Sequence, residues 1–167
     1  GLGCGLSAPG SHAACGSKEA LFREAARCYL DTFARVTECL WDDGLAPREA
    51  IELALRQSAR MQSEPGQPPG CVVALGSSSA PAAEHAAVAA PLTASRARTR
   101  AGFVHCVERG RDSGELPAGT DAVALAAVFD SFLSGVAIQA RDGVGYAVFD
   151  SAIAQILCVW DARRVPG

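Results

Sequence analysis

Apolar residues recur at every third or fourth position through much of this chain, a spacing typical of helices that bury one face. One stripe begins after Ser17 and ends near Asp43, which predicts a long helix that Gly44 stops. A second begins at Pro47, because proline suits the first turn of a helix, where its missing N–H is not needed. Its inward positions are Ile51, Ala54, Leu55, Ser58 and Met61.

The C-terminal half predicts three further helices. Residues 81 to about 111 form one long helical pattern, which Pro91 should kink or split. Thr120-Asp121 caps a helix that runs to about Arg141, and a last helix covers about Tyr146 to Ala162. Residues 65–70 form a loop by their proline and glycine content, and residues 71–75 fit a strand or, as their context favours, a helical turn. We therefore expect an all-α bundle of about six helices.

The last two helices are apolar around more than half of their circumference, whereas a surface helix of a monomer needs only one apolar stripe. A hairpin of such helices can face the domain core on one side and a twofold-related copy on the other. The alternative is that both helices form the centre of a monomeric bundle. We favour the homodimer, with an interface made by Val128, Phe132, Val136, Phe149, Ile153, Ile156 and Trp160.

Composition narrows the class of protein. The chain has 167 residues, of which 49% are hydrophobic and 20% charged, and its formal net charge of -3 excludes a protein that is basic throughout and coats nucleic acid. The seven cysteines are odd in number and lack CxxC spacing, and most fall inside apolar helical patterns, so we expect most of them to be buried, reduced thiols in the cytoplasm. We find no signal peptide and expect no apolar run long enough to span a bilayer.

The N-terminal segment suggests a DNA-binding element. Ser7 to Ala14 predicts a short helix with Pro9 in its first turn, and Gly16 ends it before Ser17 caps the long helix. Together, Gly5-Leu6-Ser7-Ala8-Pro9 and Gly16-Ser17-Lys18-Glu19-Ala20-Leu21-Phe22 resemble the end of the helix-turn-helix in the TetR family of bacterial transcription regulators. Gly114-Glu115-Leu116-Pro117 before Thr120-Asp121, and Gln139-Ala140-Arg141-Asp142-Gly143, resemble the same family, so the resemblance covers Gly5 to near the C-terminus.

This resemblance implies an all-helical homodimer with a ligand-responsive function, most simply a repressor that a small, mostly apolar effector releases from a double-stranded operator. It divides the chain into a partial helix-turn-helix region (1–20) and a ligand-binding and dimerisation domain (21–167). It assigns contacts with DNA to Ser7, Ala8, Pro9, Gly10, His12 and Lys18. It assigns the lining of the effector pocket to Phe33, Thr37, Met61, Phe103 and Phe132.

The chain departs from the family in its recognition helix. Ser11, His12 and Cys15 stand where members usually carry a large aliphatic residue, a tyrosine and a phenylalanine. Ser11 and Cys15 fill the space between the head helices poorly, and a lost large side chain typically costs about 2–5 kcal/mol. The two helices that precede this motif in the family would lie upstream of Gly1, so we expect the chain as given to bind DNA poorly by itself.

Other functions find less support. A helical small-molecule binding protein without DNA-binding activity is the main alternative. We expect no enzyme, because no nucleophile, acid and base converge, and no cofactor, because Gly1-Leu2-Gly3-Cys4-Gly5 lacks the strand and acidic residue of a dinucleotide site. His12, His85 and His105 are too scattered for a metal site, and we expect His105 in the core or the pocket. An arginine cluster within residues 96–111 fits a solvated helix face better than an anion site.

Overall fold

The computed structural model describes residues 18–65 and 83–167, apart from the side chains at positions 18, 19, 21, 22, 25 and 83–89. These residues form α1 (Lys18–Thr37), the 3-10 helix η1 (Glu38–Trp41), α2 (Pro47–Ser63), α4 (Ala83–Asp112), α5 (Ala122–Arg141) and α6 (Tyr146–Asp161). The described part of the chain contains no strand, so the all-α prediction is confirmed. The short helix predicted for 7–14 and the segment 71–75 lie outside the described residues.

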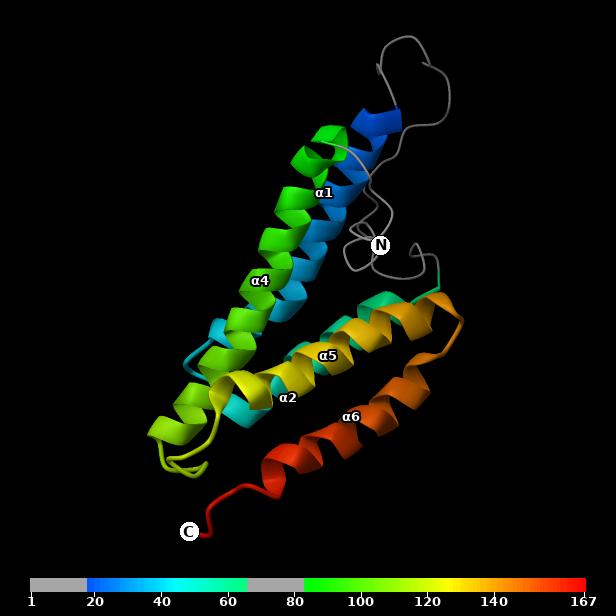
Figure 1. The fold of residues 1–167 in the computed structure, drawn as a ribbon. Helices are drawn as coiled ribbons and strands as arrows, with labels where there is room; N and C mark the ends of the chain where they lie inside the picture. Colours follow the sequence, from blue (N-terminus) through cyan, green and yellow to red (C-terminus); the bar gives the residue numbers. More distant parts are fainter. Residues whose placement is uncertain (1–17, 66–82) are drawn as a thin grey trace.

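Two parts of the molecule are distinguished by their packing (Figure 1). Helices α1 and α4 run side by side, and their N-terminal portions, residues 18–30 and 83–98, project together from the rest; we call these portions the arm. The remaining described residues form the body, in which α2 contacts both α5 and α6. The main core lies in the body and is built around four buried aromatic side chains, Phe103, Phe129, Phe149 and Trp160.

The long helix predicted from Ser17 to Asp43 is shorter than expected. It is α-helical only to Thr37 and tightens into η1, where the N–H of Asp42 bonds the carbonyl of Cys39 at 3.1 Å. This tighter winding places Leu40 against α4 beside Gly102, where an added Cβ would lie 2.9 Å from Leu40 Cβ. The docking of Leu40, which is fully buried, accounts for the early end of α1.

Two predicted elements of the C-terminal half need correction. Helix α4 runs unbroken through Pro91, which lies on an exposed face, so the predicted split does not occur. Helices α5 and α6 do not form a closely paired hairpin: α6 packs on α2, whereas α5 packs on both α4 and α2. The predicted cap of α5 is confirmed, because the Asp121 carboxylate accepts a 3.0 Å hydrogen bond from the N–H of Ala124.

Helix α5 also overturns one expectation about membranes. Its 20 residues have a mean hydropathy of 1.7 over the most apolar window, which is long and apolar enough to cross a bilayer. Length and composition alone do not distinguish such a segment from a core helix. Because Leu125, Phe129 and Leu133 of α5 pack into the main core, α5 is a core helix in this fold.

Candidate functional site

The predicted DNA contacts lie at the edge of what the structure describes. Ser7, Ala8, Pro9, Gly10 and His12 fall outside the described residues. Lys18 is the first residue of α1, and its side chain is not described. Their role in binding DNA therefore stays a prediction.

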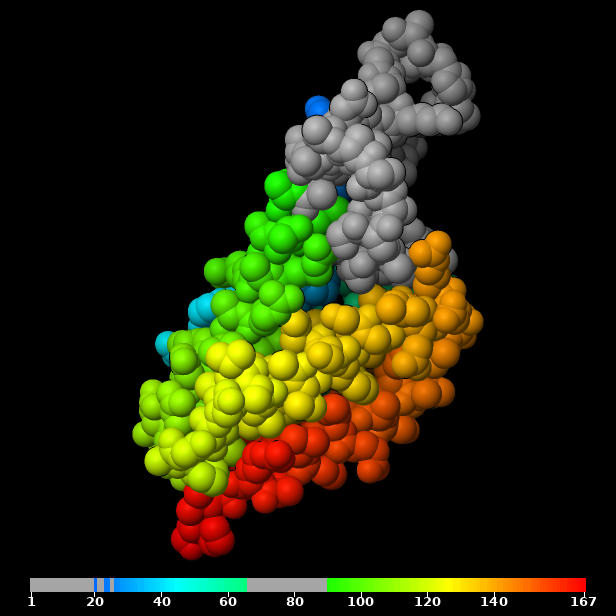
Figure 2. Space-filling model, in the orientation of Figure 1, coloured from blue at the N-terminus to red at the C-terminus, as the bar shows by residue number. Residues whose placement is uncertain are grey.

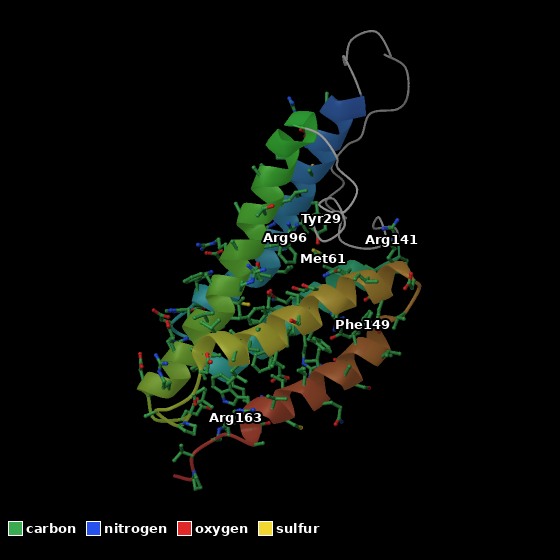
Figure 3. The ribbon with its side chains drawn as sticks, viewed as in Figure 1. Tyr29, Met61, Arg96, Arg141, Phe149 and Arg163 are labelled. Atoms are coloured by element: carbon green, nitrogen blue, oxygen red, sulfur yellow. The ribbon has the colours of Figure 1, made fainter. Side chains whose placement is uncertain are left out.

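The five residues predicted to line an effector pocket are all buried or half-buried. Phe33 and Phe103 belong to the main core, and the half-buried Met61 and Phe132 pack against that core. Phe103 stacks on Phe129 with ring centroids 6.3 Å apart. Thr37 is buried and donates its hydroxyl to the carbonyl of Phe33 at 3.0 Å, so it has no free donor. Figure 3 shows Met61 where the arm meets the body, near Tyr29 and Arg96. A role in binding an effector remains a prediction for all five.

Sequence analysis missed the polar groups of α2 in this region. Ser58 was expected in the apolar stripe without a function, and Gln62 was not singled out. Ser58 is fully buried and Gln62 is 6% exposed, yet Ser58 Oγ and Gln62 Oε1 have no hydrogen-bond partner. A buried polar group left unsatisfied costs about 1–3 kcal/mol, so such groups need an explanation. The sequence feature that could have pointed to these two residues is their spacing of four positions, which puts them on the same face of one helix.

The junction between η1 and α4 is held by a stack of cationic and aromatic side chains. Arg98 lies 4.9 Å above the Trp41 ring, which stacks on His105 with centroids 5.1 Å apart. His105 Nε2 lies 2.8 Å from Asp43 Oδ1, and this hydrogen bond lowers the pKa of Asp43. His105 is therefore a half-buried junction residue rather than a core residue. The junction fixes the end of α1, where η1 begins, to α4.

The arginines of α4 do not form an anion site. Arg98 bonds Glu38 at 2.7 Å, and Arg100 bonds Asp130 at 3.2 Å. Arg109 donates to the backbone carbonyls of Asp43 and Leu45 at 3.0 and 2.7 Å. Because carboxylates and carbonyls already engage these three guanidinium groups, the arginines fit the predicted helix face better than an anion site.

An ionic ladder joins α2 to α6. Arg48 donates two hydrogen bonds to the Asp161 carboxylate, at 2.6 and 2.9 Å, and contacts Glu52 at 3.0 Å. Glu52 also bonds Arg56 at 2.9 Å, and Arg56 in turn bonds Asp150. The hydrogen bond from Arg48 lowers the pKa of Asp161. The ladder sets the antiparallel register of the two helices, and with it the face of α6 that remains exposed.

The predicted dimer interface is corrected by this register. Val136, Phe149, Ile153 and Trp160 are at most 2% exposed and form part of the core of one protomer, where they cannot contact a partner. Trp160 also donates its indole N–H to Glu115 at 3.0 Å. Figure 3 shows Phe149 on α6, the helix that packs on α2. Only Val128, Phe132 and Ile156 of the predicted set keep exposed surface.

A different, uncharged surface covers the outside of these two helices. Between Ala122 and Ala140 the only charged residue is Asp130, and between Tyr146 and Trp160 it is Asp150; both are in ion pairs. Figure 2 shows the outsides of α5 and α6 on one side of the molecule. We call this surface the uncharged face; its exposed residues are Val123, Ala124, Ala127, Val128, Ser131, Ser134, Ile138, Gln139, Ala147, Val148, Ser151, Ala154, Gln155 and Cys158.

The cysteines of the described residues are free thiols with different surroundings. Cys106 is buried, and burial raises its pKa to about 12, so it is not ionised at neutral pH. Burial also raises the pKa of the half-buried Cys39. Cys158 is exposed, whereas the sequence predicts that most of the cysteines are buried. Within residues 18–65 and 83–167, no group of three histidine, cysteine or acidic residues is placed to hold a metal ion.

Comparison with known proteins places this arrangement in a family. No family model and no curated protein matches the chain. Two similar solved structures are both cysteine mutants of the TetR family transcriptional regulator CifR, complexed with 26 bp double-strand operator DNA. One is 33% identical, with 87% of this chain and 75% of CifR aligned at a TM-score of 0.71. The other is 31% identical, with 92% and 80% aligned at a TM-score of 0.73.

Both similar proteins are regulators rather than enzymes. The likeness holds in sequence and in fold over most of both chains, which confirms the resemblance carried by the N-terminal and inter-helix motifs. The chain belongs to the TetR family of transcriptional regulators.

Proposed function

We propose that this protein is a cytoplasmic, ligand-responsive DNA-binding regulator: a repressor that a small effector releases from its operator. The observation that carries the proposal is the likeness, over 87% and 92% of this chain, to CifR in complex with operator DNA. In this proposal residues 1–20 belong to the DNA-binding head and residues 21–167 to the effector-binding and dimerisation domain. DNA contacts are assigned to the head and to Lys18.

The proposed regulator is a homodimer assembled through the uncharged face. Val123, Ile138 and Val148 are 67%, 51% and 57% exposed, although each is a large apolar residue. The face carries alanine, serine and valine but no unpaired charge, so two copies can approach closely without burying an ion. A twofold axis through this face gives two heads, which can read half-sites separated by about 34–36 Å, one turn of DNA.

The proposed effector binds where α1, α2, α4 and α5 meet, at the region of Phe33, Met61, Phe103 and Phe132. Helix α1 leads directly from the head region into this site, and η1 fixes its far end to α4. An effector that prefers one arrangement of α1 shifts the population toward that arrangement and changes the spacing of the heads. The size of the response is limited by the difference in its affinity for the two arrangements.

Operator binding is tested with the product of the whole gene and labelled duplexes from the region upstream of that gene. Fluorescence anisotropy should show binding that is tighter than to a shuffled duplex of equal length. The affinity should fall by orders of magnitude between about 50 and 200 mM salt, because phosphate contacts release counterions. Equal, weak affinity for both duplexes would favour a helical small-molecule binding protein without DNA-binding activity.

Assembly is tested by light scattering after size-exclusion chromatography. Val148→Arg places a charge in the uncharged face and should convert the dimer to a monomer. Val165→Arg is the matched control, because Val165 is also exposed, at 43%, but lies in the C-terminal tail. A wild-type protein that remains monomeric at high concentration would contradict the proposed dimer.

A further inference from the structure

Two polar groups on one face of α2 are buried without a partner. Ser58 Oγ and Gln62 Oε1 lack any hydrogen bond, although serine in a helix commonly bonds the carbonyl one turn earlier. Ser63 on the same helix does so, donating to the carbonyl of Ala59 at 2.6 Å. The missing bonds at Ser58 and Gln62 therefore distinguish this face from the end of the same helix.

The orientation of this face follows from neighbours with known partners. Successive residues of an α-helix are about 100° apart, so Ser58 points about 160° away from Arg56, which bonds Asp150 of α6. Gln57 faces η1, because its Oε1 lies 4.0 Å from Cys39 Sγ. Gln62 lies about 40° from Ser58 on the helical wheel. The face is thus turned away from α6, and the other described helices that contact α2 are α1, η1, α4 and α5.

The interior around this face is neutral. The polar side chains buried among the described residues are Thr37, Ser58, Gln62 and Thr99, and none carries a charge. Arg109 Nη1 is also buried without a partner, but this guanidinium bonds the Asp43 and Leu45 carbonyls. Leu45 is 13 residues before Ser58, which corresponds to about 20 Å along a helix, so Arg109 does not serve the same site.

We propose that Ser58 and Gln62 select an uncharged effector that is mainly apolar and carries a hydroxyl or another neutral hydrogen-bond donor. The inference rests on the proposed effector-binding function and names its ligand class. The amide oxygen of Gln62 only accepts, so the effector donates to it, and the Ser58 hydroxyl donates or accepts as the ligand requires. A carboxylate effector binds less tightly, because none of the fully buried polar side chains of this interior is charged, and the guanidinium of the nearby Arg96 bonds Thr93 at 3.2 Å in an exposed setting.

The test uses the full chain and two sets of matched probes in thermal-shift titrations. The first set is benzyl alcohol, ethylbenzene and benzoate, and the second is 1-naphthalenemethanol, 1-ethylnaphthalene and 1-naphthoate. In at least one set the alcohol should bind about tenfold more tightly than its ethyl analogue, the effect of one ligand hydrogen bond, and more tightly than the carboxylate. The proposal is wrong if neither alcohol shows this preference.

Variants then assign the preference to the two residues. Ser58→Ala and Gln62→Met should remove the preference for the alcohol while leaving the affinity for the ethyl analogue within about twofold. Gln57→Met, on the same helix but facing η1, should keep it. The melting temperatures of unliganded Ser58→Ala and Gln62→Met should equal or exceed that of the wild type, because no protein hydrogen bond is lost. A lower melting temperature for both would overturn the proposal by showing that these groups have a structural role.

The outcome is separable from that of the regulator proposal. Loss of the alcohol preference in Ser58→Ala, in a protein without operator affinity, would leave this inference standing while the regulator proposal fails. Salt-sensitive operator binding together with equal affinity for alcohols and their ethyl analogues would support the regulator proposal and contradict this inference.

Discussion

The arm and the body of this protein bury their apolar residues to different extents. The body encloses large side chains such as Phe129, Phe149 and Trp160 in one continuous core. Among the described residues, the arm is joined to α5 through a cluster of Ala26, Leu92 and Ala137, against which Tyr29 and Leu30 pack. Small side chains remove little apolar area from water, so each contact in the arm contributes less stability than its counterpart in the body. The comparison indicates that the body is tightly packed and that the arm, with less stabilising contacts, is the part that deforms more easily.

The ion pairs of the body and of the arm also differ: those of Arg48 and Arg56 in the body connect different helices, and that of Arg27 in the arm does not. In the body, Arg48 and Arg56 connect different helices and are 27% and 28% exposed. In the arm, Arg27 is 64% exposed and pairs with Glu24 of the same helix. A pair within one helix does not hold that helix to its neighbours. The pairs of Arg48 and Arg56 therefore secure α6 on α2, whereas the pair of Arg27 with Glu24 does not tie α1 to another helix.

The largest expected effect comes from a matched pair of leucines. Leu157 of α6 and Leu92 of the arm are both 1% exposed. Leu157→Ala should lower the free energy of unfolding by about 3–5 kcal/mol, because the cavity it leaves is walled by large, well-packed residues. Leu92→Ala should cost about 2 kcal/mol or less, because its buried neighbours Ala26 and Ala137 are small and the partly buried Tyr29 and Leu30 can move into the gap. Urea denaturation measures both values.

Amide hydrogen exchange shows where each leucine variant opens. Leu92→Ala should speed exchange in the arm without affecting residues 149–160, whereas Leu157→Ala should speed exchange throughout. Equal losses of stability for the two variants would contradict the difference between arm and body.

Local signals in the sequence predicted the helices but not how they dock. The three-and-four spacing, Pro47 and the Asp121 cap are local features, and the elements they predicted are present. The burial of Phe149 and Trp160 was not predictable in this way. It depends on α6 packing on α2, a register marked by contact between Arg48 and Asp161, 113 residues apart. Likewise, the tightening of the chain at Glu38 depends on Leu40 meeting Gly102 of α4.

The candidate site was predictable only in part. Phe33 and Phe103 were correctly placed inside because aromatic residues on an apolar stripe are usually buried. Gln62 gave no such signal, since glutamine is usually exposed. Its burial and its missing partner appear only once α1, α4 and α5 close around α2.

A smaller effect is expected where helices approach most closely in the body. A Cβ at Gly110 would lie 2.6 Å from Trp160 Cη2, and Trp160 is fully buried with no room to move. Gly110→Ala should therefore destabilise the protein by about 1–3 kcal/mol, despite the higher helix propensity of alanine. Gly135→Ala in α5 is the control: nothing lies within 4 Å of its added Cβ, so it should stabilise by about 0.5–1 kcal/mol. Thermal unfolding measures both, and a stabilising Gly110→Ala would show that the body is less tightly packed than described.

The smallest expected effect concerns the ionic ladder and depends on pH. Arg48→Met should lower the free energy of unfolding at pH 7 by about 0.5–1 kcal/mol, the range for partly exposed pairs. Because the Arg48 hydrogen bond lowers the pKa of Asp161, this contribution is present above the unfolded pKa of aspartate, about 3.9, and is lost as the pH falls through the lower folded pKa. The wild type and Arg48→Met should thus converge in acid, whereas Arg27→Met in the arm should change stability less at every pH. Urea denaturation between pH 2 and 7 measures these free energies of unfolding. If wild type and Arg48→Met still differ in acid, Arg48 acts through the packing of its aliphatic stem, and the body and the arm do not differ in ionic stabilisation.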